Sequence, residues 1–159
     1  MQKHRILFVC MGNICRSPMA EGIMRSLIAE NSLKDSFEID SAGMLNYHEG
    51  ELADPRMREH AFRRGYNLTH RSRPVVDADF DCFDLIIGMD DSNIAWLDRQ
   101  APTSEARMKI RRMAEFFTKN DIDYVPDPYY GGAKGFDLVI DLLEDGCENL
   151  LKKVINHQL

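Results

Sequence analysis

A cysteine and an arginine near the start of the chain have the spacing Cys-X5-Arg, which predicts covalent chemistry on a bound anion. Cys10 follows an apolar segment, residues 6–9, whose β-branched and aromatic side chains predict a buried strand. Arg16 is followed by Ser17 and Pro18, which are typical of a helix cap and a first helical residue. We therefore expect a strand, a tight loop and a helix, with Cys10 and Arg16 at the two ends of the loop.

Such a loop points several backbone N–H groups into one concavity, and the helix dipole adds partial positive charge there. Gly12 and Asn13 are residue types that tolerate the backbone conformations that the loop requires. The amides, the dipole and the Arg16 guanidinium stabilise a thiolate at Cys10, and the guanidinium can bind two phosphate oxygens at once. A thiolate beneath a bound phosphate can accept its phosphorus atom. The loop therefore predicts an enzyme with a covalent intermediate.

Two segments of the chain resemble the signatures of one family, the low-molecular-weight protein tyrosine phosphatases. The first segment is Cys10-Met11-Gly12-Asn13-Ile14-Cys15-Arg16-Ser17-Pro18, and the second, which carries the family's general acid, is Asp127-Pro128-Tyr129-Tyr130-Gly131. The two segments lie a whole domain apart and in the family's order. The resemblance implies hydrolysis of phosphotyrosine and small aryl phosphates through a phosphocysteine intermediate.

Three residues are expected to carry this chemistry. Cys10 is the predicted nucleophile, and Arg16 is predicted to bind the phosphate. A phenolate leaves more easily when it is protonated, so a carboxylic acid is needed near the bridging oxygen. Local sequence alone favours a turn at Asp127, between two prolines, but the resemblance assigns it the role of general acid. In the second step the same carboxylate would take a proton from the attacking water.

The predicted phosphate site consists of the loop and the start of the helix. Ser17 could donate its hydroxyl to the Cys10 sulfur, or it could serve only as a helix cap, and both roles can hold in part. The expected phosphate-binding residues are Met11, Gly12, Asn13, Ile14, Cys15, Arg16 and Ser17.

The resemblance also implies supporting and substrate-binding residues. Ser41 and His70 correspond to a serine and a histidine that hold the residue at position 13 in a left-handed conformation. Tyr129 and Tyr130, with Tyr47 across the cleft, are expected to form aromatic walls around the substrate ring. His48 follows Tyr47, which replaces a tryptophan present in several relatives, so the resemblance extends to the chemistry and not to the peptide preference.

Cys15 lies in the same loop as Cys10, which suggests a redox role. Family likeness implies that peroxide could drive a Cys10–Cys15 disulfide and so protect the nucleophile from further oxidation. The alternative is a packed thiol that faces the helix.

Three other functions are compatible with parts of the same sequence. Arsenate reductases on this scaffold use two further cysteines; Cys82 is suitably placed, but position 89 is Met and no second relay thiol follows nearby. Arginine phosphatases, which are close relatives, have threonine at the position of Ile14, and an apolar side chain there better suits an aromatic ring. A catalytically silent phosphate-binding module is disfavoured because the nucleophile, the arginine and the acid are all present.

The bulk composition fits one soluble domain spanning residues 1–159. The chain has 159 residues, of which 44% are hydrophobic and 29% charged, and a formal net charge of −6. The negative charge argues against nucleic-acid or membrane partners, and no long apolar run is present. The four cysteines lack zinc-ligand spacing, so we expect reduced thiols, a cytoplasmic location, no metal and no cofactor. We expect phosphotyrosine-containing proteins or peptides as partners, and a monomer or weak self-association.

The remaining elements follow from hydrophobic periodicity. We expect strands at residues 4–10, 37–41 and 84–89, and helices from Ser17 to about residue 30 and from Pro55 to Gly65. A helix capped by Asp91 or Ser92 should run towards Pro102, a shorter helix should cover residues 107–117, and a long one should run from Phe136 to the end. Strands that alternate with helices predict an α/β fold with a central four-stranded parallel sheet, flanked by helices on both faces, and a phosphate-binding loop after the first strand.

Overall fold

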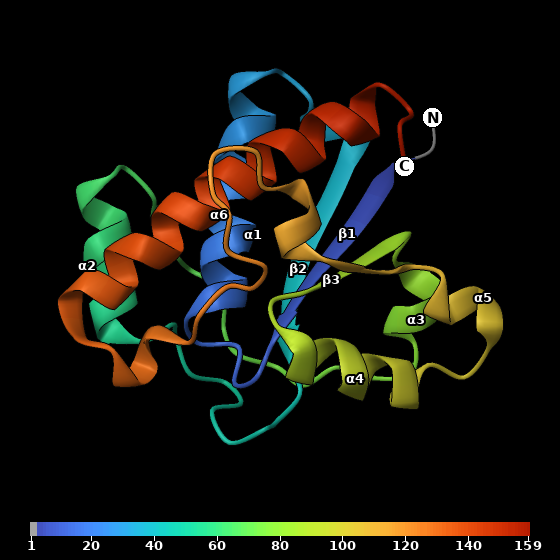
Figure 1. Cartoon of the computed structure of the whole chain (residues 1–159), viewed down its shortest axis with the longest axis horizontal. Coiled ribbons are helices and arrows are strands. Elements are labelled where there is room, and N and C mark those ends of the chain that lie inside the picture. The colour runs from blue at the N-terminus through green and yellow to red at the C-terminus, as the bar shows by residue number, and fades with distance from the viewer. Residues whose placement is uncertain (1–2) are drawn as a thin grey trace.

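A four-stranded parallel sheet forms the centre of the protein. The computed structural model describes residues 3–159, apart from the side chain of Tyr130. The strand order is β2-β1-β3-β4, with β1 at His4–Cys10, β2 at Phe37–Gly43, β3 at Leu85–Gly88 and β4 at Ile110–Arg112. The expected α/β class and the four parallel strands are confirmed (Figure 1).

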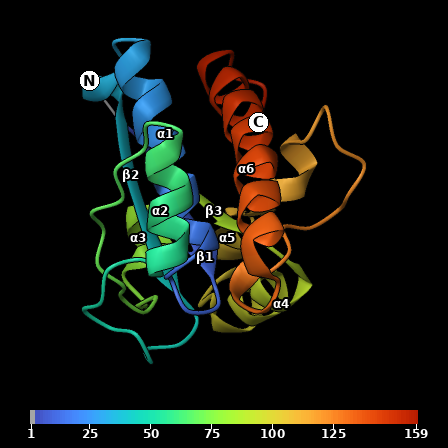
Figure 2. The same cartoon turned by 90° about the vertical axis from the view of Figure 1, so that its left-hand side faces the viewer.

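Helices cover both faces of this sheet. One group packs with α1 and the other with α4 (Figures 1 and 2). The α-helices are α1 (Arg16–Glu30), α2 (Pro55–Arg63), α3 (Asp79–Cys82), α4 (Asp91–Gln100), α5 (Ser104–Arg107) and α6 (Gly132–Ile155), and the short 3₁₀ helices are η1 (Lys34–Ser36), η2 (Met113–Phe116) and η3 (Pro128–Tyr130). No helix within residues 3–159 is long and apolar enough to cross a membrane.

Successive side chains of β1 point to opposite faces of the sheet, and both faces are buried. Ile6 and Phe8 point into the core shared with α1, α2 and α6, whereas Leu7 and Val9 point into the core shared with α3, α4 and α5. All four side chains are fully buried. A central parallel strand must be hydrophobic on both faces, because each face is covered.

The strand order places a binding crevice at the end of β1. Strand β1 pairs with β2 on one side and with β3 on the other, so the connections that leave β1 and its neighbours diverge at the carboxyl edge. Cys10 is the last residue of β1, opposite Gly43 of β2. A cleft at this position is the usual ligand site of open α/β sheets.

The expected helix over residues 107–117 is wrong. This stretch instead contains β4, in which Ile110 pairs with Ile86, and the 3₁₀ helix η2. The apolar residues Ile110, Met113 and Phe116 fit a helical period, but pairing with the free edge of β3 overrides that local preference. The sequence analysis expected four strands but located only three, because the fourth lies in a segment that it assigned to a helix.

Two helix starts also differ from expectation. Helix α1 begins at Arg16, one residue early, and its N-cap is Cys15 without a side-chain cap, so the Ser17 hydroxyl is not used as a cap. The N-cap of α4 is Asp90, whose carboxylate accepts a hydrogen bond from the Asn93 N–H at 2.9 Å, rather than Asp91 or Ser92.

Candidate active site

A cleft of about 220 Å³ opens at the carboxyl edge of β1. Most of the predicted site residues line it, and Leu45, which the sequence analysis did not identify, joins them. Asn13 and Ser17 are buried behind the cleft wall. The side chain of Tyr130 lies outside the described residues. The lining consists of Cys10, Met11, Gly12, Ile14, Cys15, Arg16, Leu45, Tyr47, His48, Asp127 and Tyr129.

Cys10 is buried in the lining of this cleft, and its sulfur faces two groups of Ser17. The Ser17 hydroxyl is 3.0 Å from Cys10 Sγ, and the Ser17 backbone N–H donates to the same sulfur at 3.4 Å. The hydroxyl also accepts a hydrogen bond from Asn13 Nδ2 at 2.8 Å, and its own proton faces the sulfur at 3.0 Å and, more distantly, the Ala42 carbonyl oxygen at 3.5 Å. Both groups would therefore face negative charge that develops on the sulfur.

Arg16 is buried, and its guanidinium is fixed from behind. Its Nη1 donates to Asp90 Oδ2 at 2.6 Å and to the Val125 carbonyl oxygen at 3.0 Å. Burial disfavours the charged guanidinium, but the neighbouring Cys10, Asp90 and Asp127 outweigh it and raise the pKa of Arg16. The fork is thus held as a cation in the cleft wall, where it can bind a tetrahedral oxyanion.

Asp127 approaches the same cleft from the other end of the chain. Its Oδ2 lies 3.7 Å from Arg16 Nη2, and its Oδ1 accepts the Tyr129 backbone N–H at 3.0 Å. Its side chain is 30% exposed. The fold therefore brings Cys10, Arg16 and Asp127 to one cavity, as the sequence analysis predicted.

Asn13 adopts the left-handed conformation expected of it, with φ of 56°, and its amide is fully bonded. Its Nδ2 donates to Ser17 Oγ and, at 3.0 Å, to Ser41 Oγ. Its Oδ1 accepts from His70 Nε2 at 2.9 Å and from the Arg73 backbone N–H at 3.1 Å. Ser41 and His70 therefore lie in the positions that the resemblance implied for them. These bonds offset the strain of a left-handed non-glycine residue.

Gly43 also shapes the loop. A Cβ built on Gly43 would lie 3.0 Å from the Met11 carbonyl oxygen and 3.1 Å from Asn13 Cβ. A side chain here would crowd the loop of residues 11–15, the candidate anion-binding loop, so glycine lets β2 approach it closely. The glycine at the end of the alternating strand pattern was visible in the sequence, but its neighbour across the sheet was not.

Cys15 faces the cleft as a mostly buried thiol. Burial, and next the nearby Cys10, raise the pKa of Cys15. Cys15 is therefore a protonated thiol beside the predicted nucleophile. All four cysteines are free in the structure.

The aromatic rim is more exposed than the base of the cleft. Tyr47 is 78% exposed and Tyr129 is 41% exposed. His48 Nδ1 lies 2.9 Å from Glu51 Oε2, which orients its ring. The guanidinium of Arg56, which the sequence analysis did not identify, lies over the Tyr129 ring, 5.2 Å from its centre, and helps to hold this ring in place.

Asp90 is the main residue that the sequence analysis missed. It combines two roles, since Oδ1 caps α4 and Oδ2 binds Arg16. A signal was present: Asp90 lies just beyond a buried strand, at the edge where the ends of parallel strands meet. Its partner Arg16 could not be predicted, because neither segment alone indicates that β1 and β3 pair or in which register.

Comparisons with known proteins agree with this geometry. Residues 5–159 match the model of the family described as low molecular weight phosphotyrosine protein phosphatase. A low molecular weight protein-tyrosine-phosphatase of Streptomyces coelicolor is 40% identical over 154 residues, covering 95% of this chain and 93% of the relative.

The chain is also similar to solved structures of phosphatases. A crystal structure of a protein tyrosine phosphatase from Entamoeba histolytica is 48% identical, with a TM-score of 0.96, and the match covers 99% of this chain and 100% of that one. The crystal structure of a Drosophila arginine phosphatase is 32% identical with a TM-score of 0.87, over 94% of this chain and 96% of that one.

Proposed function

Because the chain belongs to the low molecular weight phosphotyrosine protein phosphatase family, we propose that it hydrolyses phosphotyrosine in proteins, and small aryl phosphates, through a phosphocysteine intermediate. The observation that carries the proposal is the position of Cys10, which lines the cleft with its Sγ 3.0 Å from the Ser17 hydroxyl. Arg16 and Asp127 line the same cavity. A nucleophile, an anion site and an acid therefore face one substrate volume.

In the first step, the Cys10 thiolate attacks the phosphorus atom as the bond to the phenolic oxygen breaks. Asp127, as the carboxylic acid, gives its proton to that oxygen, so that a neutral phenol leaves. The backbone N–H groups of residues 11–15 and the Arg16 guanidinium balance the charge on the three equatorial oxygens. No metal or cofactor takes part in this scheme.

In the second step, the Asp127 carboxylate takes a proton from a water molecule whose oxygen attacks the phosphocysteine. The S–P bond breaks, inorganic phosphate forms and the Cys10 thiolate returns. The Ser17 hydroxyl and backbone N–H stabilise the departing sulfur, since both face it in the structure. Catalysis thus ends in the starting protonation state, with Asp127 as the acid again.

The cleft walls favour an aryl substrate. Ile14 and Leu45 line the cavity together with Tyr47 and Tyr129, so that a phenyl ring would contact mostly apolar surface. An arginine phosphatase is the second candidate function, because a Drosophila protein of that activity shares the fold. The apolar side chain at Ile14 argues against it, since a charged guanidinium would lose its hydration without a polar partner there.

Arsenate reduction is the weaker alternative. It would require two further relay thiols near Cys10, but of the other cysteines only Cys15 lines the cleft, whereas Cys82 lies at the end of α3 and Cys147 is buried in α6. Substrate turnover coupled to thioredoxin would revive this alternative.

We also propose that residues 1–159 act as one domain, in the cytoplasm, as a monomer or with weak self-association. One sheet and its two helical layers support the single domain. The four unpaired cysteines fit a reducing compartment, and the net charge of −6 fits neither nucleic acid nor an anionic membrane as a partner. Phosphotyrosine-containing proteins or peptides are the proposed substrates.

The direct test is hydrolysis of p-nitrophenyl phosphate by the wild type and by Cys10→Ser. We expect loss of at least about 10⁴-fold in kcat for Cys10→Ser and no change for the exposed control Cys82→Ser. Matched phosphotyrosine and phosphoarginine peptides then decide the substrate. Undiminished activity of Cys10→Ser would overturn the mechanism, and preference for phosphoarginine would overturn the substrate assignment.

A further inference from the structure

One segment of this acidic protein is strongly basic. The chain has a formal net charge of −6, yet residues 55–73, which comprise α2 and part of the connection to α3, contain a single acidic residue, Glu59. The arginines of this segment are Arg56, Arg58, Arg63, Arg64, Arg71 and Arg73. A local excess of positive charge attracts an acidic partner where the protein has not already neutralised it.

Most of these guanidiniums are already paired with carboxylates of the protein. The pairs are Arg56 with Asp54, Arg63 with Glu59, Arg64 with Asp137, Asp141 and Glu144, and Arg73 with Asp40 and Asp79. Within residues 3–159, the two arginines of this segment that lack a carboxylate partner are Arg58 and Arg71. The uncompensated positive charge of the segment therefore lies on these two side chains.

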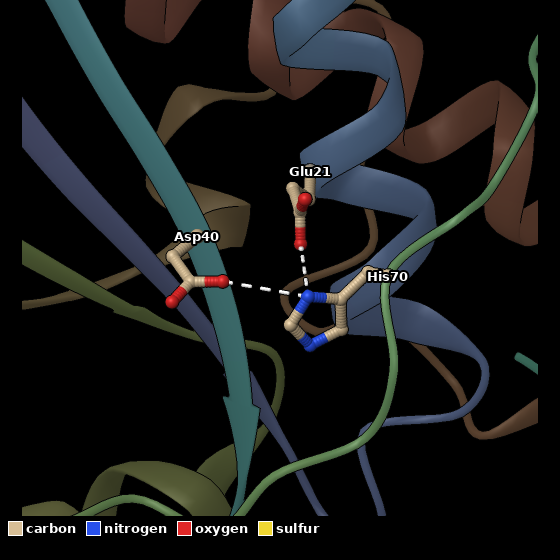
Figure 3. A group of neighbouring side chains, drawn as sticks. All are labelled: Glu21, Asp40 and His70. Carbon is tan, nitrogen blue, oxygen red and sulfur yellow. Dashed lines mark ion pairs between the residues drawn. The ribbon is translucent and has the colours of Figure 1, made fainter. Parts of the chain in front are cut away.

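The residue before Arg71 is anchored by two acids that have other partners. His70 Nδ1 lies 3.2 Å from Glu21 Oε1 and 3.4 Å from Asp40 Oδ1 (Figure 3). Asp40 also binds the guanidinium of Arg73. These contacts fix the backbone that leads into Arg71, and they leave both carboxylates committed elsewhere. The exposed Arg71 guanidinium is thus held at a defined place without being neutralised.

Arg58 and Arg71 line the same groove, which lies between α2 and residues 67–71 and has a volume of about 620 Å³. Arg58 Nε donates to the Ala53 carbonyl oxygen at 2.9 Å, and Arg71 Nη1 donates to the Gly50 carbonyl oxygen at 2.8 Å. A backbone carbonyl therefore orients each guanidinium. Two oriented guanidiniums in one groove are a binding surface for carboxylates.

A short ladder separates this groove from the candidate active-site cleft. Leu52 forms an antiparallel bridge with Arg71, and the Gly50 N–H donates to the Ser72 carbonyl oxygen at 2.8 Å. The cleft extends to His48 and the groove begins at Leu52, four residues further along the chain. Four residues span at most about 14 Å, so an extended polypeptide bound in the cleft reaches the groove within a few residues.

We propose that this groove, hereafter the arginine groove, binds acidic residues of the substrate polypeptide that lie about four residues from the phosphotyrosine. The inference rests on the proposed function, since it assigns the sequence preference of that reaction. Carboxylates would pair with Arg58 and Arg71. Leu52, Leu68 and Phe62, which is 72% exposed, also line the groove and offer apolar surface to the neighbouring side chains of the same polypeptide.

The first test measures kcat/KM for phosphotyrosine peptides in which a pair of glutamates, or of glutamines, is moved stepwise away from the phosphotyrosine on either side. At one spacing the glutamate peptide should be favoured about three- to tenfold, through a lower KM, and salt should weaken this preference. The preference should disappear in the double variant Arg58→Gln, Arg71→Gln. It should remain in the control Arg99→Gln, Arg107→Gln, which removes the same charge from exposed positions of α4 and α5. Neither double variant should change the rate with p-nitrophenyl phosphate.

The second test uses only the wild type, and so does not depend on whether the variants fold. A glutamate peptide with a non-hydrolysable phosphonate in place of the phosphate should shift the ¹⁵N resonances of Nε in Arg58 and Arg71. It should leave those of Arg99 and Arg107 unmoved, and the matched glutamine peptide should shift none of the four.

The outcomes separate this inference from the proposed function. Hydrolysis of all phosphotyrosine peptides at equal rates would overturn the arginine groove and leave the phosphatase activity intact, whereas hydrolysis of none would overturn both. A glutamate preference that survives in Arg58→Gln, Arg71→Gln, or that is lost equally in the control, would overturn the groove in favour of a general charge effect. A wild-type dimer that dissociates in the groove variant would instead assign the groove to a second copy of the chain.

Discussion

The two loops that meet at the cleft are held in opposite ways. In the anion-binding loop, Asn13 and Ser17 are buried and hydrogen-bonded to one another and to two neighbouring elements. In the acid-bearing loop, Asp127 is 30% exposed and reaches Arg16 at 3.7 Å. The proposed nucleophile is thus preorganised by a buried network, whereas the proposed acid is partly exposed, where it can follow the leaving group.

The two loops should therefore respond differently to substitution, and after loss of Cys10 itself the largest effect is expected for Asp127→Ala. With phenyl phosphate, whose leaving group needs protonation, kcat should fall by about 10²–10⁴-fold. With p-nitrophenyl phosphate the loss should be smaller, because that phenolate leaves unaided. Steady-state kinetics with both esters checks this.

The control is Asp123→Ala, which removes an exposed carboxylate from the same connection and should change neither rate. Equal losses with both esters in Asp127→Ala would remove this residue from the acid role and place its contribution in binding.

Asp90→Asn tests whether the buried side of the cleft is preorganised through Arg16. The amide can still cap α4 but replaces the carboxylate that binds Nη1 at 2.6 Å, so the guanidinium loses its orientation. We expect kcat/KM for aryl phosphates to fall by about 10²-fold. The control Asp91→Asn removes the solvent-facing partner of Arg112, and full activity is expected there. Equal activity of the two variants would mean that Arg16 needs no anchor.

The variant Cys15→Ser tests whether Cys15 protects Cys10 from permanent oxidation. Peroxide converts the Cys10 thiolate to a sulfenic acid, which the Cys15 thiol condenses with to give a disulfide and water. We expect a several-fold larger fraction of permanent activity loss in Cys15→Ser than in the wild type or Cys82→Ser, measured after dithiothreitol recovery. If the wild type recovers no better than Cys15→Ser, the thiol is only packing.

The smallest effect on catalysis is expected at Asp145, which anchors the start of the connection to the acid. It accepts hydrogen bonds from Thr118, Lys119 and Asn120. Burial opposes the charge, but these bonds outweigh it and lower the pKa of Asp145. Its stabilisation is therefore complete above the unfolded pKa, about 4, and is lost as the pH falls through the lower folded value.

We expect Asp145→Asn to cost about 1–3 kcal/mol at pH 7 by urea unfolding, and the difference from wild type to shrink towards pH 3. Asp141→Asn, on the exposed side of α6, should cost less than about 1 kcal/mol. A difference for Asp145→Asn that does not change with pH would assign the loss to packing.

The same contrast explains what could be predicted from the sequence. The first loop is contiguous, so Cys10, Gly12, Asn13 and Arg16 express its geometry in one stretch. Strand β1 was recognisable because a central strand must be apolar on both faces. By contrast, local sequence predicts only a turn at Asp127, and its role as the acid came from the family resemblance.

What failed depended on contacts between distant segments. Strand β4 forms because Ile110 pairs with Ile86, and residues 107–117 alone fit a helix as well. The Asp90 carboxylate reaches Arg16 because β3 pairs with β1. The cluster of Glu21, Asp40 and His70 likewise joins residues from three separate segments. Periodicity reports which face of an element is buried, but it does not report what lies opposite.

The central claim is that an ionised sulfur at Cys10 accepts phosphorus from an aromatic ester. Rapid acid quench during turnover of p-nitrophenyl phosphate, followed by mass spectrometry of the digested protein, tests it directly. We predict one phosphate on the peptide that contains Cys10, a larger trapped amount in Asp127→Ala, and none in Cys10→Ser. Continued turnover of the wild type with no phosphorylated thiol, or with the phosphate on another residue, would contradict the account.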